Sequence, residues 1–209
     1  IPILLHVVFP EAALTNDFWR TLYISYLCHG LRLAPDYITL DLRLNTSFLV
    51  EILSTKGTCK VIGNLQLVDP DPPPWNDSSW RSYYEKAQAV GCDLVRFTRK
   101  ARNAAENFDV RLVQQLADST SGPRLPIIAY NTGALGRWSA CFNRILTSVN
   151  PYEYRNGKPL AHAESNIPIG PTLTAFEATQ ALYSSFYYEP MRLYVFGANV
   201  SYSLSPAMH

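Results

Sequence analysis

The chain has 209 residues, a length that allows one domain or one domain and part of a second. Its 18 Lys and Arg residues nearly balance its 17 Asp and Glu residues, which argues against direct binding to nucleic acid, because nucleic-acid binders need a basic excess to neutralise phosphates. A hydrophobic content of 47% can supply a core, and the apolar runs are far shorter than the ~20 residues of a membrane helix, so we expect no membrane span.

Apolar runs alternate with amphipathic segments along the chain. The runs predict strands at residues 3–8, 37–42, 59–67, 94–98, 126–130 and 145–149. The segments predict helices at residues 15–33, 46–53, 78–90, 104–117, 135–143 and 173–183. We expect Asp77 or Ser78 to cap the 78–90 helix and Gly91 to end it. This alternation is typical of a parallel sheet with right-handed crossovers, and both an open doubly wound sheet and most of an eight-fold barrel fit it.

Residues that would hold a metal, a disulfide or a dinucleotide show no suitable spacing. No GxGxxG follows the first strand, and we expect no cofactor. Three histidines show no metal-ligand spacing with a carboxylate or a cysteine, namely His6, His29 and His162. We therefore assign no metal site. The four cysteines form no CxxC pair, and we expect reduced core thiols of an intracellular protein; they are Cys28, Cys59, Cys92 and Cys141.

Both ends of the sequence look cut. It opens at Ile1 inside an apolar run without an initiator Met, and it closes at His209 where a new element is beginning. We therefore expect a fragment of a longer polypeptide.

Two segments resemble known families. Residues 126–139, PIIAYNTGALGRWS, resemble the seventh strand and following loop of type I 3-dehydroquinate dehydratases, which read roughly P-I-I-x-x-x-M-G-x-x-G-x-x-S-R. Residues 194–209, YVFGANVSYSLSPAMH, are similar to the opening of shikimate dehydrogenases, a strand followed by glycine and an S-x-S-P-x-x-H turn. The two in tandem resemble the AROM polypeptides of fungi and the related family of fungal quinate repressors.

The resemblance implies a fold and a division into domains. Residues 1–188 would be an incomplete (β/α)8 barrel of the type I dehydroquinase kind, spanning about strands three to eight, and residues 189–209 would begin a shikimate dehydrogenase-like domain. Residues 3–8 would then be the third strand. Because six strands cannot close a barrel, we expect the open edges to be covered by a dimer, by rearrangement, or by the strand at residues 192–196.

The same resemblance implies that the catalytic groups are lost. The general-base histidine of the family falls at Gln66, whose carboxamide does not titrate near neutral pH. The Schiff-base lysine falls at Arg96, whose guanidinium stays protonated and has no lone pair for imine formation. Two arginines of the family fall at Ala140 and at or near Val8, and the glutamine of its lid falls near Gly170, so none of these positions carries the family's side chain.

Three sets of residues each have two interpretations. Gln66 and Arg96 either fill an old cavity after neutral drift or form a remodelled pocket in which Arg96 binds a carboxylate such as that of quinate. The basic group Arg96, Arg99, Lys100 and Arg102 is either a solvated strand-to-helix edge or a polyanion site. Ser203 and Ser205 match two hydroxyls that bind shikimate in the dehydrogenase family, and either of them could equally cap a helix before Pro206.

The resemblance therefore implies a regulatory pseudo-enzyme of the nucleus or cytoplasm. It would control quinate-utilisation genes through contact with a transcription activator, and a quinate-pathway metabolite would relieve this contact. The alternative is a fragment of an AROM-type dehydratase and dehydrogenase, which Gln66 and Arg96 argue against.

Overall fold

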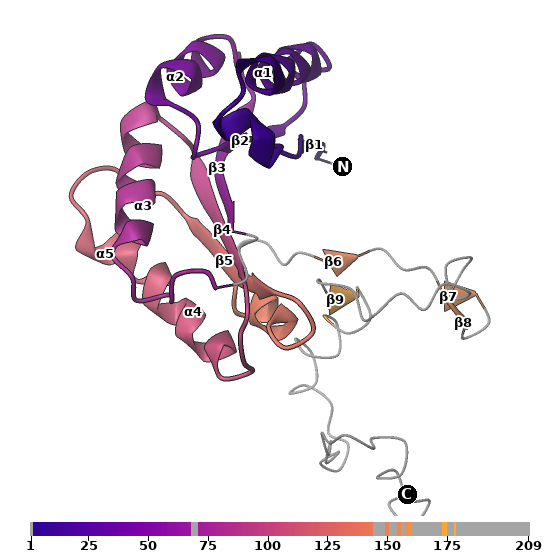
Figure 1. The fold of residues 1–209 in the computed structure, drawn as a ribbon, viewed down its shortest axis with the longest axis vertical. Helices are drawn as coiled ribbons and strands as arrows, with labels where there is room; N and C mark the ends of the chain where they lie inside the picture. The colour runs from indigo at the N-terminus through magenta and orange to yellow at the C-terminus, as the bar shows by residue number, and fades with distance from the viewer. Residues whose placement is uncertain are drawn as a thin grey trace, which may run out of the picture.

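Five parallel strands form the main sheet of the computed structural model, which describes residues 2–67 and 71–143 and the short pieces 149–150, 154–155, 158–159, 173–174 and 178 (Figure 1). The strands follow one another across the sheet in chain order, with β1 and β5 at its edges. They are β1 (Leu4–Leu5), β2 (Tyr37–Asp41), β3 (Lys60–Leu67), β4 (Leu94–Lys100) and β5 (Ile127–Thr132).

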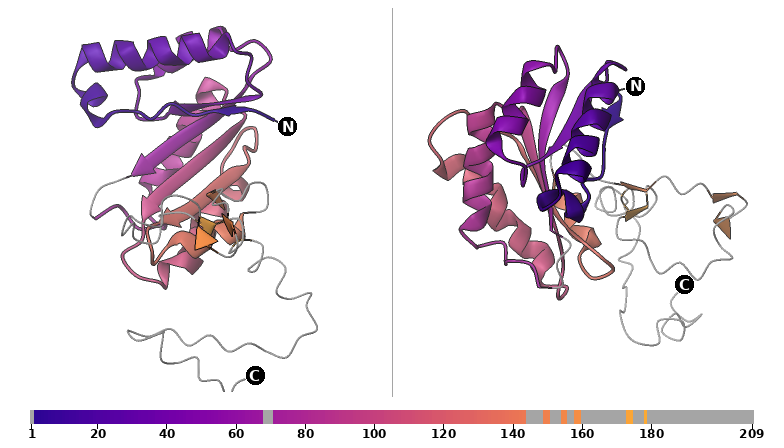
Figure 2. Two further views of the ribbon diagram at one scale, coloured as in Figure 1. Left: turned by 90° about the vertical axis from the view of Figure 1, so that its right-hand side faces the viewer. Right: turned by 45° about the horizontal axis from the view of Figure 1, so that its top comes forward.

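The helices that connect these strands are α1 (Asp17–Leu31), α2 (Thr46–Ser54), α3 (Ser79–Val90), α4 (Glu106–Gln114) and the short α5 (Leu116–Ser119). They lie along one face of the sheet (Figures 1 and 2). A doubly wound sheet has helices on both faces and a reversal in strand order, and the described sheet has neither. Between the two folds that the sequence left open, the structure therefore has the barrel arrangement.

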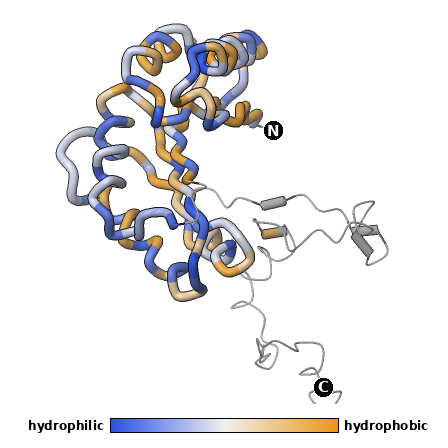
Figure 3. Tube along the Cα trace, viewed as in Figure 1, coloured by the Kyte–Doolittle hydropathy of each residue, from blue (hydrophilic) through white to orange (hydrophobic). Residues whose placement is uncertain are grey.

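The main core lies between the sheet and the helices. Successive side chains of a strand point to opposite faces, and on β2 Ile38 and Leu40 point toward the helices while Thr39 and Asp41 point to the other face. Figure 3 shows apolar residues concentrated along the strands, and the helices contribute Leu27, Leu49, Trp80 and Val110 to the same core. The face away from the helices carries a smaller apolar cluster, which consists of Ile62, Leu94, Ile128, Tyr130, Ala140, Leu173 and Ala178.

The ends of α3 follow from local hydrogen bonding. Ser78 occupies the N-cap position without a capping bond from its side chain, and Asp77 Oδ1 instead accepts from the backbone N–H of Ser79 at 2.8 Å. Gly91 ends the helix with φ of 83°, in the left-handed region that glycine adopts without strain, and the N–H of Cys92 then reaches the carbonyl of Ala87 at 3.0 Å. Asp77 and Gly91 therefore set the bounds of this helix.

Several predicted elements differ in the structure. Residues 3–8 form only the two-residue strand β1, because the chain pairs with β2 over Leu4 and Leu5 alone. The predicted 104–117 helix begins at Glu106 and divides after Gln114, and the 135–143 helix is the 3-10 helix η2 (Arg137–Phe142). A second 3-10 helix, η1 (Glu11–Leu14), precedes α1.

The prediction of a helix at residues 173–183 is wrong at its start. Leu173 and Thr174 form strand β9 (Leu173–Thr174), which pairs in parallel with β6 (Val149–Asn150), and the buried Leu173 packs in the smaller apolar cluster. Residue 178 is helical, and the rest of that range lies outside the described residues. Residues 145–148 of the predicted 145–149 strand also lie outside them. A small antiparallel pair, β7 (Tyr154–Arg155) and β8 (Lys158–Pro159), completes the described elements.

None of the four cysteines, all of which lie in the described ranges, forms a disulfide, and two of them are in the core as expected. Cys59 and Cys92 are buried, and burial raises the pKa of the Cys92 thiol to about 12, which makes it a poor nucleophile. Cys141 is partly buried. The expectation was wrong for Cys28, which is exposed because it lies on the outer side of α1. No helix in the described ranges is long and apolar enough to span a membrane.

Candidate functional site

Polar side chains line the inner face of the sheet, away from the helices, toward the carboxyl ends of the strands. β3 contributes Asn64 and Gln66, and β4 contributes Arg96 and Thr98. The register pairs Asn64 with Arg96 and Gln66 with Thr98, so the four side chains form two adjacent rows across the sheet. The outward neighbour Leu65 is fully buried against the helices. Active sites of (β/α)8 barrels lie at this end of the strands, so this face is the candidate site.

Arg96 is the cation at the centre of these rows. Its Nε donates to Asn64 Oδ1 at 2.8 Å, and its Nη2 lies 3.3 Å from Nδ1 of His6. The side chain is half-buried, and this burial lowers the pKa of Arg96, an effect that the nearby Tyr130 hydroxyl opposes. No carboxylate among the described residues forms an ion pair with Arg96. A half-buried guanidinium without an anionic partner favours binding of an anion.

His6 reaches this centre from the chain just after β1. Its Nδ1 lies 2.7 Å from Thr39 Oγ1 on β2, in addition to its contact with Arg96. Partial burial lowers the pKa of His6, the charge of Arg96 lowers it further, and Asp41 opposes both effects. The imidazole is therefore neutral at pH 7.

Three ionised side chains border the site beside His6. Arg43 Nη2 contacts Asp41 Oδ2 at 2.9 Å, and its Nη1 contacts Glu11 Oε1 at 2.6 Å. Burial opposes the charge of Arg43, but the hydrogen bonds that Arg43 donates to both carboxylates outweigh it and raise the pKa of Arg43. Because both carboxylates are already bound to Arg43, they are poorly placed to neutralise Arg96.

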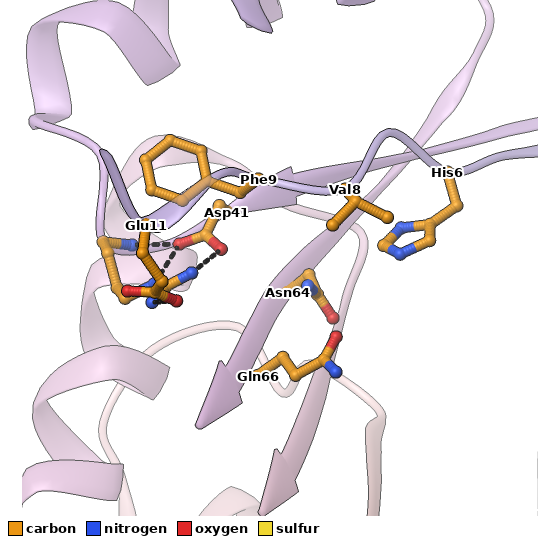
Figure 4. A pocket seen from close by; sticks show the side chains of 8 residues that line it. His6, Val8, Phe9, Glu11, Asp41, Asn64 and Gln66 are labelled. Carbon is orange, nitrogen blue, oxygen red and sulfur yellow. Dashed lines mark hydrogen bonds and ion pairs between the residues drawn. The ribbon is translucent and has the colours of Figure 1, made fainter. Parts of the chain in front are cut away.

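His6, Asn64 and the ion pairs of Arg43 lie around a small cavity (Figure 4). Its volume is about 70 Å³, which suits a carboxylate group or two waters, whereas drug-sized ligands occupy ~300–1,000 Å³. It is lined by His6, Val8, Phe9, Glu11, Asp41, Arg43, Asn64 and Gln66. The described part of the chain thus forms the floor of a site rather than a complete pocket.

The predicted site residues fall into three groups. Gln66 and Val8 line the cavity, and Arg96 lies beside it, bonded to the lining residues Asn64 and His6. Ala140 is buried in the smaller apolar cluster and does not line the cavity. Gly170, Ser203 and Ser205 lie outside the described residues. No group of three potential metal-ligating side chains gathers anywhere in the described ranges.

Sequence reasoning missed the two partners of Arg96, Asn64 and His6, and also Thr39, which contacts His6. These three are single polar residues in apolar runs, and each faces inward while its neighbours face the helices. The period-two alternation of β2, β3 and β4 could have placed Thr39, Asn64 and Arg96 on the same face. The position of His6 could not be found in this way, because its contact with Arg96 joins residues 90 positions apart.

The two hypotheses for the basic group, a solvated strand-to-helix edge and a polyanion site, were both wrong for Arg99. Its side chain is fully buried, with Nη2 2.6 Å from Glu106 Oε2 and Nη1 3.0 Å from the carbonyl of Pro73. Arg102 Nε contacts the other oxygen of Glu106 at 2.9 Å. Hydrogen bonds from Arg102 and the charge of Arg99 hold the pKa of Glu106 below its ordinary value, although burial alone would raise it. Arg99 is thus part of a structural ion-pair network that joins β4, α4 and the loop after β3.

A strand order without reversal, helices on one face and polar groups at the strand ends define an incomplete (β/α)8 barrel. The type I 3-dehydroquinase family model matches residues 2–188, and the chain belongs to that family.

Curated relatives carry two names. The chain is 42% identical to the quinate repressor protein of Emericella nidulans over its whole length, covering 23% of that protein, and 33% identical to the one of Talaromyces stipitatus, covering 86% of the chain and 20% of that protein. It is 28% identical to the pentafunctional AROM polypeptide of Candida glabrata, covering 88% of the chain and 11% of that protein. The chain thus spans less than a quarter of the length of these relatives.

Solved structures show the same fold. The dehydroquinate dehydratase and shikimate dehydrogenase from S. pombe AroM matches with a TM-score of 0.65 at 18% identity, covering 87% of this chain and 32% of that chain. The type I 3-dehydroquinate dehydratase of Clostridium difficile matches with a TM-score of 0.62 at 16% identity, covering 88% of this chain and 69% of that chain.

Proposed function

We propose that this chain is a non-catalytic dehydroquinase-like domain of a repressor that controls quinate-utilisation genes. The similarity to two quinate repressor proteins supports the regulatory role. In this proposal the domain binds a carboxylate metabolite of the quinate pathway, and the repressor acts by contact with a transcription activator.

The observation that carries the proposal is the chemistry at Arg96. The side chain lies at the strand end where a barrel places its reactive groups, but it is a guanidinium bonded to the Asn64 amide and facing a neutral imidazole. It can bind a carboxylate through two parallel N–H groups, and it cannot attack a ketone. Gln66, one strand away on the same face, cannot act as a general base. In this proposal Arg96 and Gln66 form a site that binds a carboxylate but lacks the groups for imine formation and proton transfer.

Ser203 and Ser205 remain part of the proposal as a second ligand site, in a shikimate dehydrogenase-like segment that we place at residues 189–209. Either serine could instead cap a helix. Binding of shikimate would distinguish the two roles, since a capping serine contributes to stability alone.

The similarity to AROM polypeptides favours a second candidate, a fragment of a 3-dehydroquinate dehydratase. The test is the absorbance of dehydroshikimate after addition of dehydroquinate, with borohydride trapping to detect an imine. The pseudo-enzyme proposal expects neither product nor adduct. Turnover by the unmodified chain would replace it with the enzyme.

The carboxylate site needs its own experiment, a calorimetric titration with quinate. We expect saturable binding that Arg96→Gln weakens at least tenfold, because a charge-assisted bidentate contact contributes about 1.5–3 kcal/mol. Arg32→Gln, which removes a guanidinium just after α1 and outside the cavity lining, serves as the matched control and should leave the affinity unchanged. Equal binding by the Arg96 variant and the unmodified chain would remove Arg96 from the site.

A further inference from the structure

His6 is the titratable group of the site that the proposed function leaves without a role. Its Nδ1 faces two groups at once, Thr39 Oγ1 at 2.7 Å and Arg96 Nη2 at 3.3 Å. An imidazole nitrogen has one lone pair or one proton, so Nδ1 either accepts or donates. The contact with Arg96, which can only donate, requires Nδ1 to accept.

Protonation of His6 would reverse this arrangement. With a proton on Nδ1, the imidazolium donates to Thr39 Oγ1, and Arg96 Nη2 loses its acceptor. Two positive charges then face each other across 3.3 Å, which is unfavourable while the site is empty. An anion that accepts from Arg96 Nη2 takes the place of the imidazole and compensates both charges.

The charged groups around His6 leave this compensation to a ligand. Asp41 on β2 is the carboxylate whose charge acts on His6, but it is bound to Arg43, as is Glu11 of η1. On the other side of His6, α1 contributes Tyr26 and His29 to an open groove. His29 Nδ1 lies 2.8 Å from the carbonyl of Ser25 on its own helix.

We propose that His6 takes up a proton when a carboxylate binds at Arg96, so that imidazolium and guanidinium hold the anion together. The inference rests on the proposed function, because it assigns a second cationic group to the same site. The proton comes from solvent, and the only bond formed is the N–H of His6. The ligand class is therefore a small carboxylate whose affinity rises as the pH falls.

The sign of the pH dependence follows from the free site. Partial burial and Arg96 lower the pKa of His6, so the free imidazole is neutral around pH 7. A bound anion raises the pKa of His6, and the bound form therefore holds more protons than the free form. By linkage, binding tightens as the pH falls from 8 to 6.

Calorimetric titration with quinate tests the proposal. The unmodified chain is titrated at pH 6 and pH 8 in two buffers of different ionisation enthalpy, neither of which contains a phosphate or a carboxylate. We expect proton uptake on binding and an affinity about fivefold higher at pH 6, the size of effect that one neighbouring charge gives. His6→Gln, which retains a hydrogen-bonding side chain but does not titrate, should bind quinate with no proton uptake. His29→Gln should behave as the unmodified chain.

The outcomes separate this inference from the function on which it rests. Quinate binding with the same pH dependence in the unmodified chain and in His6→Gln would overturn the inference and leave the carboxylate site in place. Absence of quinate binding at both pH values would overturn the carboxylate site and the inference together. An NMR titration of His6, in which quinate leaves its pKa unchanged despite binding, would also overturn it.

Discussion

Arg96 on β4 and Asn64 on β3 occupy paired positions, and the guanidinium Nε donates to the amide oxygen over 2.8 Å. An amide fixes the orientation of the guanidinium without neutralising its charge, whereas a carboxylate in the same place would do both. The contact therefore leaves the Nη side of Arg96 as an oriented cation, with Nη2 3.3 Å from Nδ1 of His6, a residue that lines the cavity. This relationship supports the site as a receptor for an anion.

Restoring the two family side chains should not restore catalysis. We expect the double variant Gln66→His and Arg96→Lys to form no dehydroshikimate, because the arginines that the resemblance places at Val8 and Ala140 would still be absent. General acid–base help contributes ~10²–10⁴-fold, and correct positioning of the substrate can contribute as much again. The measurement is dehydroshikimate absorbance together with borohydride trapping. Turnover in the double variant alone would show that the rest of the catalytic pocket is intact.

The Arg99–Glu106 ion pair should be a major source of stability. Glu106→Gln leaves a fully buried guanidinium without its charge partner, and we expect a loss of about 2–4 kcal/mol in the free energy of unfolding. The matched control is Asp118→Asn, which removes the carboxylate of the exposed Arg124–Asp118 pair and should cost less than about 1 kcal/mol. Urea unfolding of the three proteins measures both values. Equal stability of the two variants would contradict the structural role of the buried pair.

The same carboxylate predicts an acid-sensitive fold. The pKa of Glu106 is lower in the folded chain than its ordinary value of 4.5, so its contribution is fully present above pH 4.5 and is lost as the pH falls through the folded value. The unmodified chain should therefore lose stability below about pH 4.5 more steeply than Glu106→Gln. Urea midpoints between pH 3 and pH 7 would show this, and parallel curves for the two proteins would count against it.

Whether a feature of the fold or of the site could be predicted from the sequence depended on how far apart in the chain its contacting residues lie. Gly91 and the apolar runs at residues 59–67 and 94–98 act locally, and they placed α3, β3 and β4 within a few residues of their observed bounds. The burial of Arg99 depends on Glu106 and on the carbonyl of Pro73, which is 26 residues away, so it could not be predicted from a run of basic residues. The site shows the same limit. Gln66 and Arg96 were found through the family motif, whereas His6 enters only through folding.

The position of β1 at the edge of the described sheet predicts self-association. Leu4 is 40% exposed on this strand, and the exposed Tyr26 and Leu33 line a groove together with the neighbouring Leu5. An unpaired apolar edge promotes strand pairing between molecules, and lysine on an edge strand opposes it. We expect light scattering to give a mass above that of one chain, and Leu4→Lys to reduce it. Leu112→Lys on α4, with a similar exposure of 46%, should leave the mass unchanged. A monomeric unmodified chain would contradict the prediction.

The central claim, a site that binds without catalysis, is tested most directly by calorimetric titration with 3-dehydroquinate. A binding-only site predicts that the heat of each injection returns to baseline and that binding saturates. Arg96→Gln should lower the affinity at least tenfold, the loss expected for a charge-assisted contact. Sustained heat after each injection, with dehydroshikimate accumulating in the cell, would contradict the account.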